Sequence, residues 1–178
     1  GGTGAYQFSK DGGTTFVSSN VFAGLAAGNY SFIVKDANNC LVTVPLSITE
    51  PSLLTLSAAK TDILCFGGTS VVTLSAGGGT GAYQFSKDGG ATFVSSNVFS
   101  GLIAGNYSFI VKDANECATT IAVSITEPSA LTVSASKTDI LCFGETSTVT
   151  LSATGGTGTY LFSKDGGATF VSSNVFRS

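Results

Sequence analysis

The sequence is a tandem repeat with a long period. The residues GTGAYQFSKDGG begin at Gly2, return at Gly79 and come back at Gly156 as GTGTYLFSKDGG, so the period from Gly2 to Gly79 is 77 residues. A unit of this length can form a small domain by itself, and it exceeds the roughly 20 to 50 residues of typical solenoid repeats. We therefore expect separate domains in series, each folding largely on its own.

Two Glu-Pro-Ser sequences, at 50–52 and 127–129, mark the joints between the repeats. They divide the chain into the C-terminal part of a first repeat (1–52), a complete repeat (53–129) and the N-terminal part of a third (130–178). We expect the sequence to be a slice of a longer protein, because both outer repeats are partial.

The composition limits the possible chemistry. Charged residues make up 11% of the chain, against about 25% in an average globular protein. Eight Lys and Arg residues and a net charge of −3 provide no positive patch for nucleic acid or an anionic membrane, so neither is expected as a partner. The chain has no His, the usual general base near neutral pH. We do not expect an enzyme, and we expect no cofactor.

Apolar residues alternate with polar ones through the complete repeat, and this period of two predicts half-buried strands. Seven or so short strands, separated by Gly, Asn and Asp turns, indicate an all-β fold of tandem immunoglobulin-like antiparallel β-sandwich repeats. The loop 101–105 is expected to separate two of these strands. The aromatic volume between the sheets is expected from Tyr83, Phe85, Tyr107 and Phe109.

The four cysteines follow the same period. Cys40 and Cys117 come after an Asp-Ala-Asn turn, and Cys65 and Cys142 lie between the first two strands of their repeats. Regular placement in a secreted chain favours a disulfide framework. A zinc site is disfavoured because there is no CxxC spacing and no His, and a catalytic thiol has no base to activate it.

Three pairings stay open. Small secreted domains usually close their own bridges, which favours Cys65–Cys117 within one repeat. In an immunoglobulin-type sandwich, however, these two loops lie a strand length apart, which instead favours a bridge from the early cysteine of one repeat to the late cysteine of the next. The pairings Cys40–Cys65 and Cys117–Cys142 rank last, because those loops are expected at far ends of neighbouring domains.

The repeat resembles the SprB-type repeats of gliding bacteria. The resemblance covers essentially the whole chain and rests on Cys-Phe-Gly, Gly-Gly-Thr-Gly-x-Tyr, Leu-x-Ala-Gly-x-Tyr-x-Phe-x-Val-x-Asp-Ala-Asn-x-Cys and Ile-Thr-Glu-Pro. Phe85 stands where many such repeats have Trp. Members of that family are very long surface adhesins exported by the type IX secretion system, so the resemblance implies an extracellular location on the bacterial cell surface and a role in adhesion or gliding motility.

The remaining motifs have simple structural interpretations. Lys87–Gly90 fits a hairpin turn, since it has neither the following helix of a phosphate loop nor the carboxylates of a calcium loop. Calcium at the turns 36–39 and 113–116 is a weaker interpretation than hydrogen bonds of the Asx type. Aromatic residues that do not alternate cleanly are candidates for a sugar-binding face, although core packing is favoured; they are Phe16, Phe22, Phe93, Phe99, Phe170 and Phe176.

Two functional classes follow from these observations. The chain is expected to be a structural or adhesive stalk whose partners are its neighbouring repeats, or else a module that binds surface polysaccharide through a face repeated along the array. We also expect the two partial repeats to complement each other head to tail between molecules.

Overall fold

A computed structural model describes residues 2–177 of the chain, and over this range every regular element is a β-strand. The predicted all-β class is therefore confirmed. The chain divides into two compact units, residues 1–52 and 53–178, whereas the three-segment division stays a prediction; Gly1 and Ser178, the outer ends of the predicted segments, lie outside the described range. Residues 2–177 include no helix that could span a lipid bilayer.

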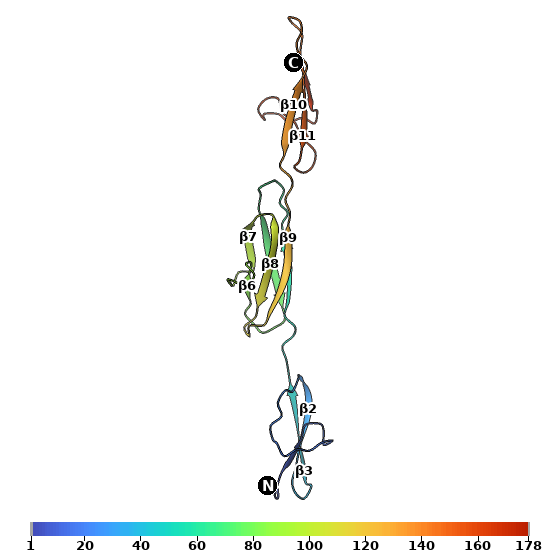
Figure 1. Cartoon of the computed structure of the whole chain (residues 1–178), viewed down its shortest axis with the longest axis vertical. Helices are drawn as coiled ribbons and strands as arrows, with labels where there is room; N and C mark the ends of the chain where they lie inside the picture. The colour runs from blue at the N-terminus through green and yellow to red at the C-terminus, as the bar shows by residue number, and fades with distance from the viewer. Residues whose placement is uncertain (1, 178) are drawn as a thin grey trace. The chain divides into compact units, whose positions relative to one another are not determined.

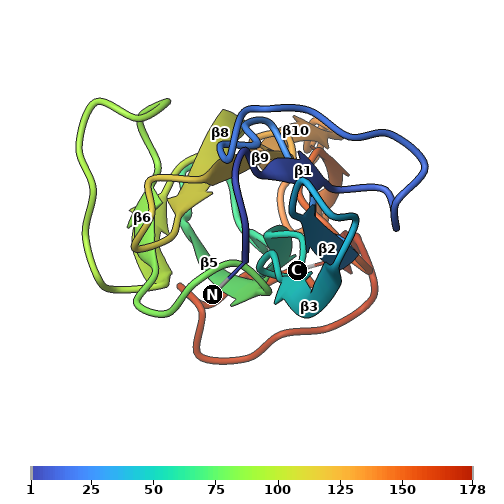
Figure 2. The same ribbon diagram turned by 90° about the horizontal axis from the view of Figure 1, so that it is seen from below.

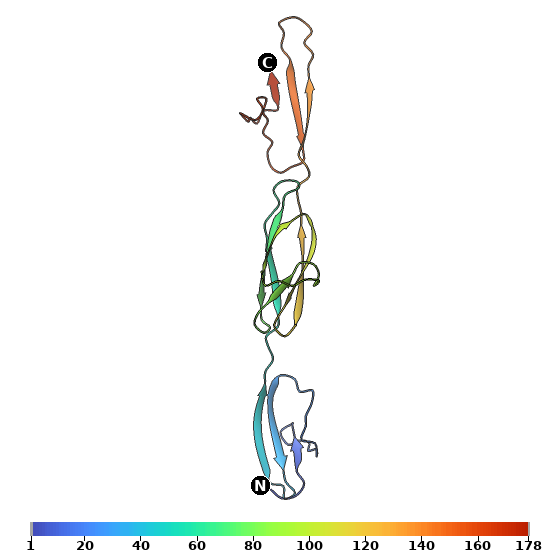
Figure 3. The same ribbon diagram turned by 90° about the vertical axis from the view of Figure 1, so that its left-hand side faces the viewer.

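The first unit contains one antiparallel sheet in the order β1-β2-β3. Its strands are β1 (Gln7–Ser9), β2 (Gly28–Lys35) and β3 (Leu41–Ile48). The strands β2 and β3 form a long hairpin in full register from Gly28↔Ile48 to Lys35↔Leu41, and the short β1 pairs with the end of β2 (Figure 3). Val42, Val44 and Leu46 of β3 are exposed on one face of this hairpin.

The complete repeat lies in the second unit and consists of two three-stranded sheets (Figure 1). One sheet has the order β4-β5-β7 and the other β6-β8-β9, and all neighbouring strands are antiparallel. The strands are β4 (Thr55–Lys60), β5 (Ser70–Gly77), β6 (Gln84–Ser86), β7 (Val98–Leu102), β8 (Gly105–Lys112) and β9 (Ala118–Ile125). The immunoglobulin-type assignment of this topology stays a prediction.

A third sheet of the second unit has the order β10-β11-β12. It is built from β10 (Thr132–Lys137), β11 (Thr148–Thr154) and β12 (Val175–Arg177). These strands occupy the positions in the repeat that β4, β5 and β7 occupy one period earlier. The third sheet therefore reproduces one half of the complete repeat.

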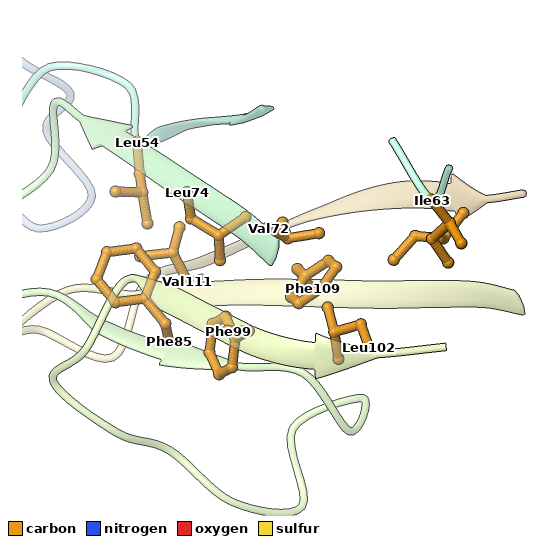
Figure 4. Packing of buried hydrophobic residues seen from close by; sticks show 10 residues of the cluster. Leu54, Ile63, Val72, Leu74, Phe85, Phe99, Leu102, Phe109 and Val111 are labelled. Carbon is orange, nitrogen blue, oxygen red and sulfur yellow. The ribbon is translucent and has the colours of Figure 1, made fainter. Parts of the chain in front are cut away.

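One hydrophobic core fills the space between the two sheets of the complete repeat (Figure 4). Strands β5 and β8 supply its fully buried centre, and the aromatic rings of Phe99 and Phe109 meet at 5.4 Å between centroids. Phe85 and Phe109 are buried as predicted, while Tyr83 and Tyr107 pack at its edge. The buried members are Leu54, Ile63, Val72, Leu74, Phe85, Phe99, Leu102, Phe109, Val111 and Ile125.

Strand β7 continues further than the sequence predicts. The loop expected at 101–105 begins only after Leu102, because this side chain is buried and its backbone pairs with Ser70 across a register shift in β5. The shift is a β-bulge, which adds a residue to one strand and turns it locally. The hydroxyl of the buried Ser70 donates a hydrogen bond to the carbonyl of Thr61 at 2.6 Å, so this buried hydroxyl has a partner.

The chain enters and leaves the complete repeat at opposite ends. At the entry end, Thr55 of β4 pairs with Gly77 of β5. Thr80 follows β5 at the same end, and its backbone N–H donates to Asp113 in the turn after β8. At the other end, Ile125 pairs with Gly105, the first residue of β8. A strand of eight residues spans roughly 25 Å, so consecutive joints are separated by about the length of the domain.

Candidate functional surface

The structure does not support the predicted disulfide framework. Cys40, Cys65, Cys117 and Cys142 are all free thiols and all exposed. The regular spacing of the cysteines reflects the repeat itself, which places each thiol on a corresponding loop.

The pairing favoured within one repeat, Cys65–Cys117, is ruled out by the arrangement of the loops. Cys65 lies in the loop between β4 and β5, whereas Cys117 follows the turn between β8 and β9. Glu127, just beyond β9, binds Gly67 at the end that holds Cys65, and Cys117 precedes β9 at the other end. The roughly 25 Å of an eight-residue strand far exceeds the 7 Å limit between Cα atoms in a disulfide.

Three of the six candidate aromatic residues, Phe22, Phe99 and Phe176, occupy corresponding positions of successive repeats. Phe99 is a buried member of the core, so its assignment to a binding face is wrong. Phe22 is half-buried and its ring lies 5.6 Å from that of Phe32, the counterpart of the Phe99–Phe109 pair. Phe176 lies at the corresponding position of β12 and is also half-buried. The packing interpretation is therefore correct for Phe99, and for Phe22 and Phe176 it stays a prediction.

Phe93 lies on the opposite, outer side of the β6-β8-β9 sheet. The ammonium group of Lys112 sits 4.6 Å from the centre of its ring, a distance typical of a cation–π contact. Lys112 in turn bonds to the carboxylate of Glu116 at 3.0 Å. We call the surface formed by Phe93, Ile110, Lys112 and Glu116 the outer patch. It combines an aromatic face, a cation and a carboxylate on the exposed side of one sheet.

The first unit carries the same arrangement. The ammonium group of Lys35 lies 4.2 Å from the centre of the Phe16 ring. A Cβ atom added at Gly13 would contact Ile33 and Phe16. In the complete repeat, a Cβ atom added at Gly90 would contact the corresponding residues, Ile110 and Phe93. The corresponding Phe170, in the segment between β11 and β12, is 60% exposed. The sequence indicated Phe16 and Phe93 but not their lysine partners, which lie 19 residues further along, on β2 and β8.

A polar turn holds Phe93 in place. The loop that follows β6 extends from the edge of the sheets (Figure 2) and is tied back by Phe85 and Val94, which exchange backbone hydrogen bonds of 2.8 and 2.9 Å. Inside the loop, Asp88 accepts hydrogen bonds from the hydroxyls of Ser86 and Thr92, both at 2.6 Å. These bonds, that of Ser86 first, hold the pKa of Asp88 well below its ordinary value. The predicted hairpin turn thus contains a short polar network.

The Asp-Ala-Asn turn is organised by a buried carboxylate. Asp113 accepts backbone N–H groups from Thr80, Asn115 and Cys117 at 2.8, 2.9 and 3.0 Å. These bonds, that of Thr80 first, lower its pKa. The bond to Asn115 is the Asx-type contact that we favoured over calcium. Within residues 2–177, no group of three or more acidic, His or Cys side chains is placed to hold a metal ion.

A contact at the exit of the complete repeat was not predicted from the sequence. The carboxylate of Glu127, in the Glu-Pro-Ser joint, accepts the N–H of Gly67 at 2.7 Å. Gly67 belongs to the Cys-Phe-Gly motif 60 residues earlier. The contact ties the start of the joint to the end of its own domain. The one sequence signal for this contact is that the Cys-Phe-Gly and Glu-Pro-Ser motifs both recur with the repeat.

Comparison with known proteins assigns the repeat. Residues 134–169 match the family model described as SprB repeat, and the same stretch one period earlier spans 57–92 of the complete repeat. No curated protein matches the chain. The match indicates a repeat region of the kind found in cell-surface adhesins. Residues 134–169 are thus a SprB-type repeat segment, and the stretch 57–92 is its counterpart one period earlier.

Proposed function

We propose that this chain is a structural segment of a long bacterial cell-surface protein, acting outside the cell as a stalk or filament in adhesion or gliding. The observation that carries the proposal is the entry and exit of the chain at opposite ends of the complete repeat. A domain joined in this way adds its own length to the array. The partners of each repeat are then its neighbours in the chain, and the role requires no catalytic site.

The interior of the complete repeat supports this role. Its two sheets enclose one apolar core, and every buried side-chain N or O atom of residues 2–177 has a hydrogen-bond partner. A domain with a satisfied and closed interior keeps its shape without a ligand. Glu127 additionally holds the beginning of the joint against Gly67, which limits how freely the chain can bend as it leaves the domain.

Inserting whole repeats tests the proposal. Variants with one, two or three further copies of 53–129 inserted after Ser129 should increase in maximum dimension by a constant step, roughly 25 to 40 Å per copy. Small-angle X-ray scattering measures this dimension. A maximum dimension that stays constant, or that grows only as the cube root of mass, contradicts a stalk.

A second candidate function is polysaccharide binding through the outer patch. The observation that favours it is the repetition of the cation–π pair, Lys112 with Phe93 and Lys35 with Phe16. Aromatic faces bordered by charged groups suit sugar rings, which present both C–H faces and hydroxyls. Copies of such a patch along an array would bind a polymer more tightly through multivalency.

A pull-down with bacterial and host polysaccharides tests the second candidate. Phe93→Ala combined with Phe16→Ala should abolish binding, whereas Phe66→Ala, which removes an exposed aromatic residue outside the patch, should leave it intact. Circular dichroism confirms that each variant keeps its fold. If the polysaccharide retains the wild-type chain, the double variant and Phe66→Ala equally, the outer patch is not the binding site.

A further inference from the structure

We propose that the joint between the complete repeat and the third sheet is braced by contacts on both sides, so that the two hold a fixed orientation. The brace is an interface between the exit-end loop, residues 64–67 where the chain leaves the complete repeat, and the loop 155–158 after β11. Both loops belong to the compact unit 53–178. Such a brace goes beyond the proposed role, because a stalk can have either free or fixed joints.

The exit-end loop contacts the chain on both sides of the joint. The backbone N–H of Gly67 donates to the carboxylate of Glu127, at the start of the joint, at 2.7 Å. The carbonyl of Leu64 accepts the hydroxyl of Thr157 at 3.3 Å, across 93 residues of sequence. One short loop thus binds the chain where it leaves the complete repeat and binds it again beyond β11 of the third sheet.

The third sheet approaches the joint from its own side. The backbone N–H of Gly156 donates to the carbonyl of Ser129 at 2.8 Å. Next to it, Gly155 lies so close that an added Cβ would overlap the carbonyl of Ala130. A residue with a side chain would have to push this loop away from the joint. Together with the bonds of the exit-end loop, these contacts enclose 127–130 from both sides.

The backbone of the joint is itself restricted. Pro128 fixes its own φ angle and disfavours the helical conformation at Glu127. The bonds made by Gly67 and Thr157 are exposed to water, so each is weak alone. The bonded groups are connected through short segments, however, so once one bond has formed, closing the others costs little further entropy. We therefore expect the contacts to form and open as a unit.

The contact between Thr157 and Leu64 uses two motifs that recur with the period of the array. Leu64 begins Leu-Cys-Phe-Gly, and Thr157 belongs to Gly-Gly-Thr-Gly. In the complete repeat, the corresponding hydroxyl of Thr80 accepts the side-chain amide of Asn115 at 3.1 Å. A hydroxyl can accept and donate at the same time, so a threonine at this place can bind its own domain and the preceding one. The two motifs therefore share a role in joining repeats.

Residual dipolar couplings of the full chain test the brace, because they report the orientation of each amide relative to one molecular frame. Couplings from the strands of the complete repeat and from β10 and β11 should fit a single alignment tensor. Gly155→Ala should break this agreement, so that the two sets need separate tensors, with weaker alignment of β10 and β11. Gly158→Ala is the matched control, since Gly158 has a φ of 83° against 80° for Gly155 but open space for a Cβ.

A second variant separates loss of the brace from misfolding of the loop. Thr157→Val removes the hydroxyl and keeps the branched shape of the side chain, so it should also produce separate tensors, whereas Thr159→Val, at an exposed threonine of the same segment, should not. Couplings that still fit each sheet by itself show that a variant remains folded.

Separate tensors in the wild-type chain overturn the proposal. A single tensor in a folded Gly155→Ala variant, or equal effects of Thr157→Val and Thr159→Val, overturns it as well. None of these results changes the outcome of inserting whole repeats, which tests the stalk separately.

Discussion

The carboxylate of Asp113 accepts the backbone N–H of Thr80 at 2.8 Å, across 33 residues of sequence. The bond joins the turn after β8 to the loop that follows β5, and so connects the two sheets at the end where the chain enters the repeat. Ala114 adds a backbone bond to the carbonyl of Thr80 at 3.1 Å. The Asp-Ala-Asn and Gly-Gly-Thr-Gly motifs of the repeat therefore meet in space.

Replacing Asp113 should destabilise the complete repeat. Asp113→Ala leaves three backbone N–H groups without their acceptor, and hydrogen bonds to charged groups are among the stronger ones. We expect the melting temperature to fall by at least about 5 °C, measured by circular dichroism. Asp62→Ala, at an exposed carboxylate paired only with Lys60, is the control, and an equal shift in both variants would contradict the role of Asp113.

Stability should decline in acid. The folded-state pKa values of Asp11, Asp36, Asp88, Asp113 and Asp165 lie below the ordinary value because each carboxylate accepts hydrogen bonds. Below about pH 4 the unfolded chain therefore binds more protons than the folded one. The free energy of unfolding should be level above about pH 5 and should fall as the pH drops below about 4 through the folded-state pKa values. Urea titrations across this range measure it, and constant stability down to pH 2 would refute the expectation.

Two glycines with similar backbones should respond differently to alanine. Gly79 and Gly81 have φ values of 63° and 59°, so a side chain at either costs about 1–2 kcal/mol. Only at Gly79 would the added Cβ lie 2.7 Å from the Asp113 carboxylate, while the space around Gly81 is open. Chemical denaturation should give a clearly larger loss for Gly79→Ala than for Gly81→Ala. Equal losses would mean that the turn can move away from Asp113.

Truncating the core should cost far more than truncating an exposed leucine. Leu74 is fully buried between the sheets, and Leu74→Ala should lower the free energy of unfolding by about 3 kcal/mol. Leu64 is 73% exposed, and Leu64→Ala should change it by less than about 0.5 kcal/mol. If urea denaturation showed similar values for the two variants, the position of the core would be wrong.

The contact of Glu127 with Gly67 should limit motion at the joint. Glu127→Gln keeps the shape of the side chain but removes the charge that strengthens the 2.7 Å bond. We expect faster hydrogen exchange of the Gly67 amide with little loss of global stability, since the contact is exposed. Exchange measured by NMR tests this, with the Gly68 amide, bonded to the Cys65 carbonyl, as the internal control. Unchanged exchange at Gly67 would show that the bond is not maintained in solution.

Much of the strand pattern could be predicted because it is local. Alternation through Leu54, Leu56 and Ala58 identified the interior face of β4, and the same reasoning identified Ile121, Val123 and Ile125 in β9. Successive side chains of a strand point to opposite faces, so the sequence carries this information directly. The end of β7 was missed because it depends on the pairing of Leu102 with Ser70 on a distant strand.

The candidate site was only partly predictable. Phe93 and Phe99 lie six residues apart in similar apolar surroundings, yet one belongs to the outer patch and the other to the core. The hairpin turn at Lys87–Gly90 separates them from β6, and the path of the loop after it decides which side of the sheet each ring reaches. The lysine that covers Phe93 comes from β8, so no local pattern could have indicated it.

The sequence alone determined the period of the array, the strand class, the interior face of strands such as β4 and β9, and the turn chemistry, because all of these depend on neighbours along the chain. Only the tertiary structure decided which loops share an end of the domain. The arrangement of the loops separates Cys65 from Cys117 and brings Asp113 to Thr80 and Glu127 to Gly67. Its physical reason is that strand order and direction arise from pairing between distant segments, which the period of side chains along one strand does not encode.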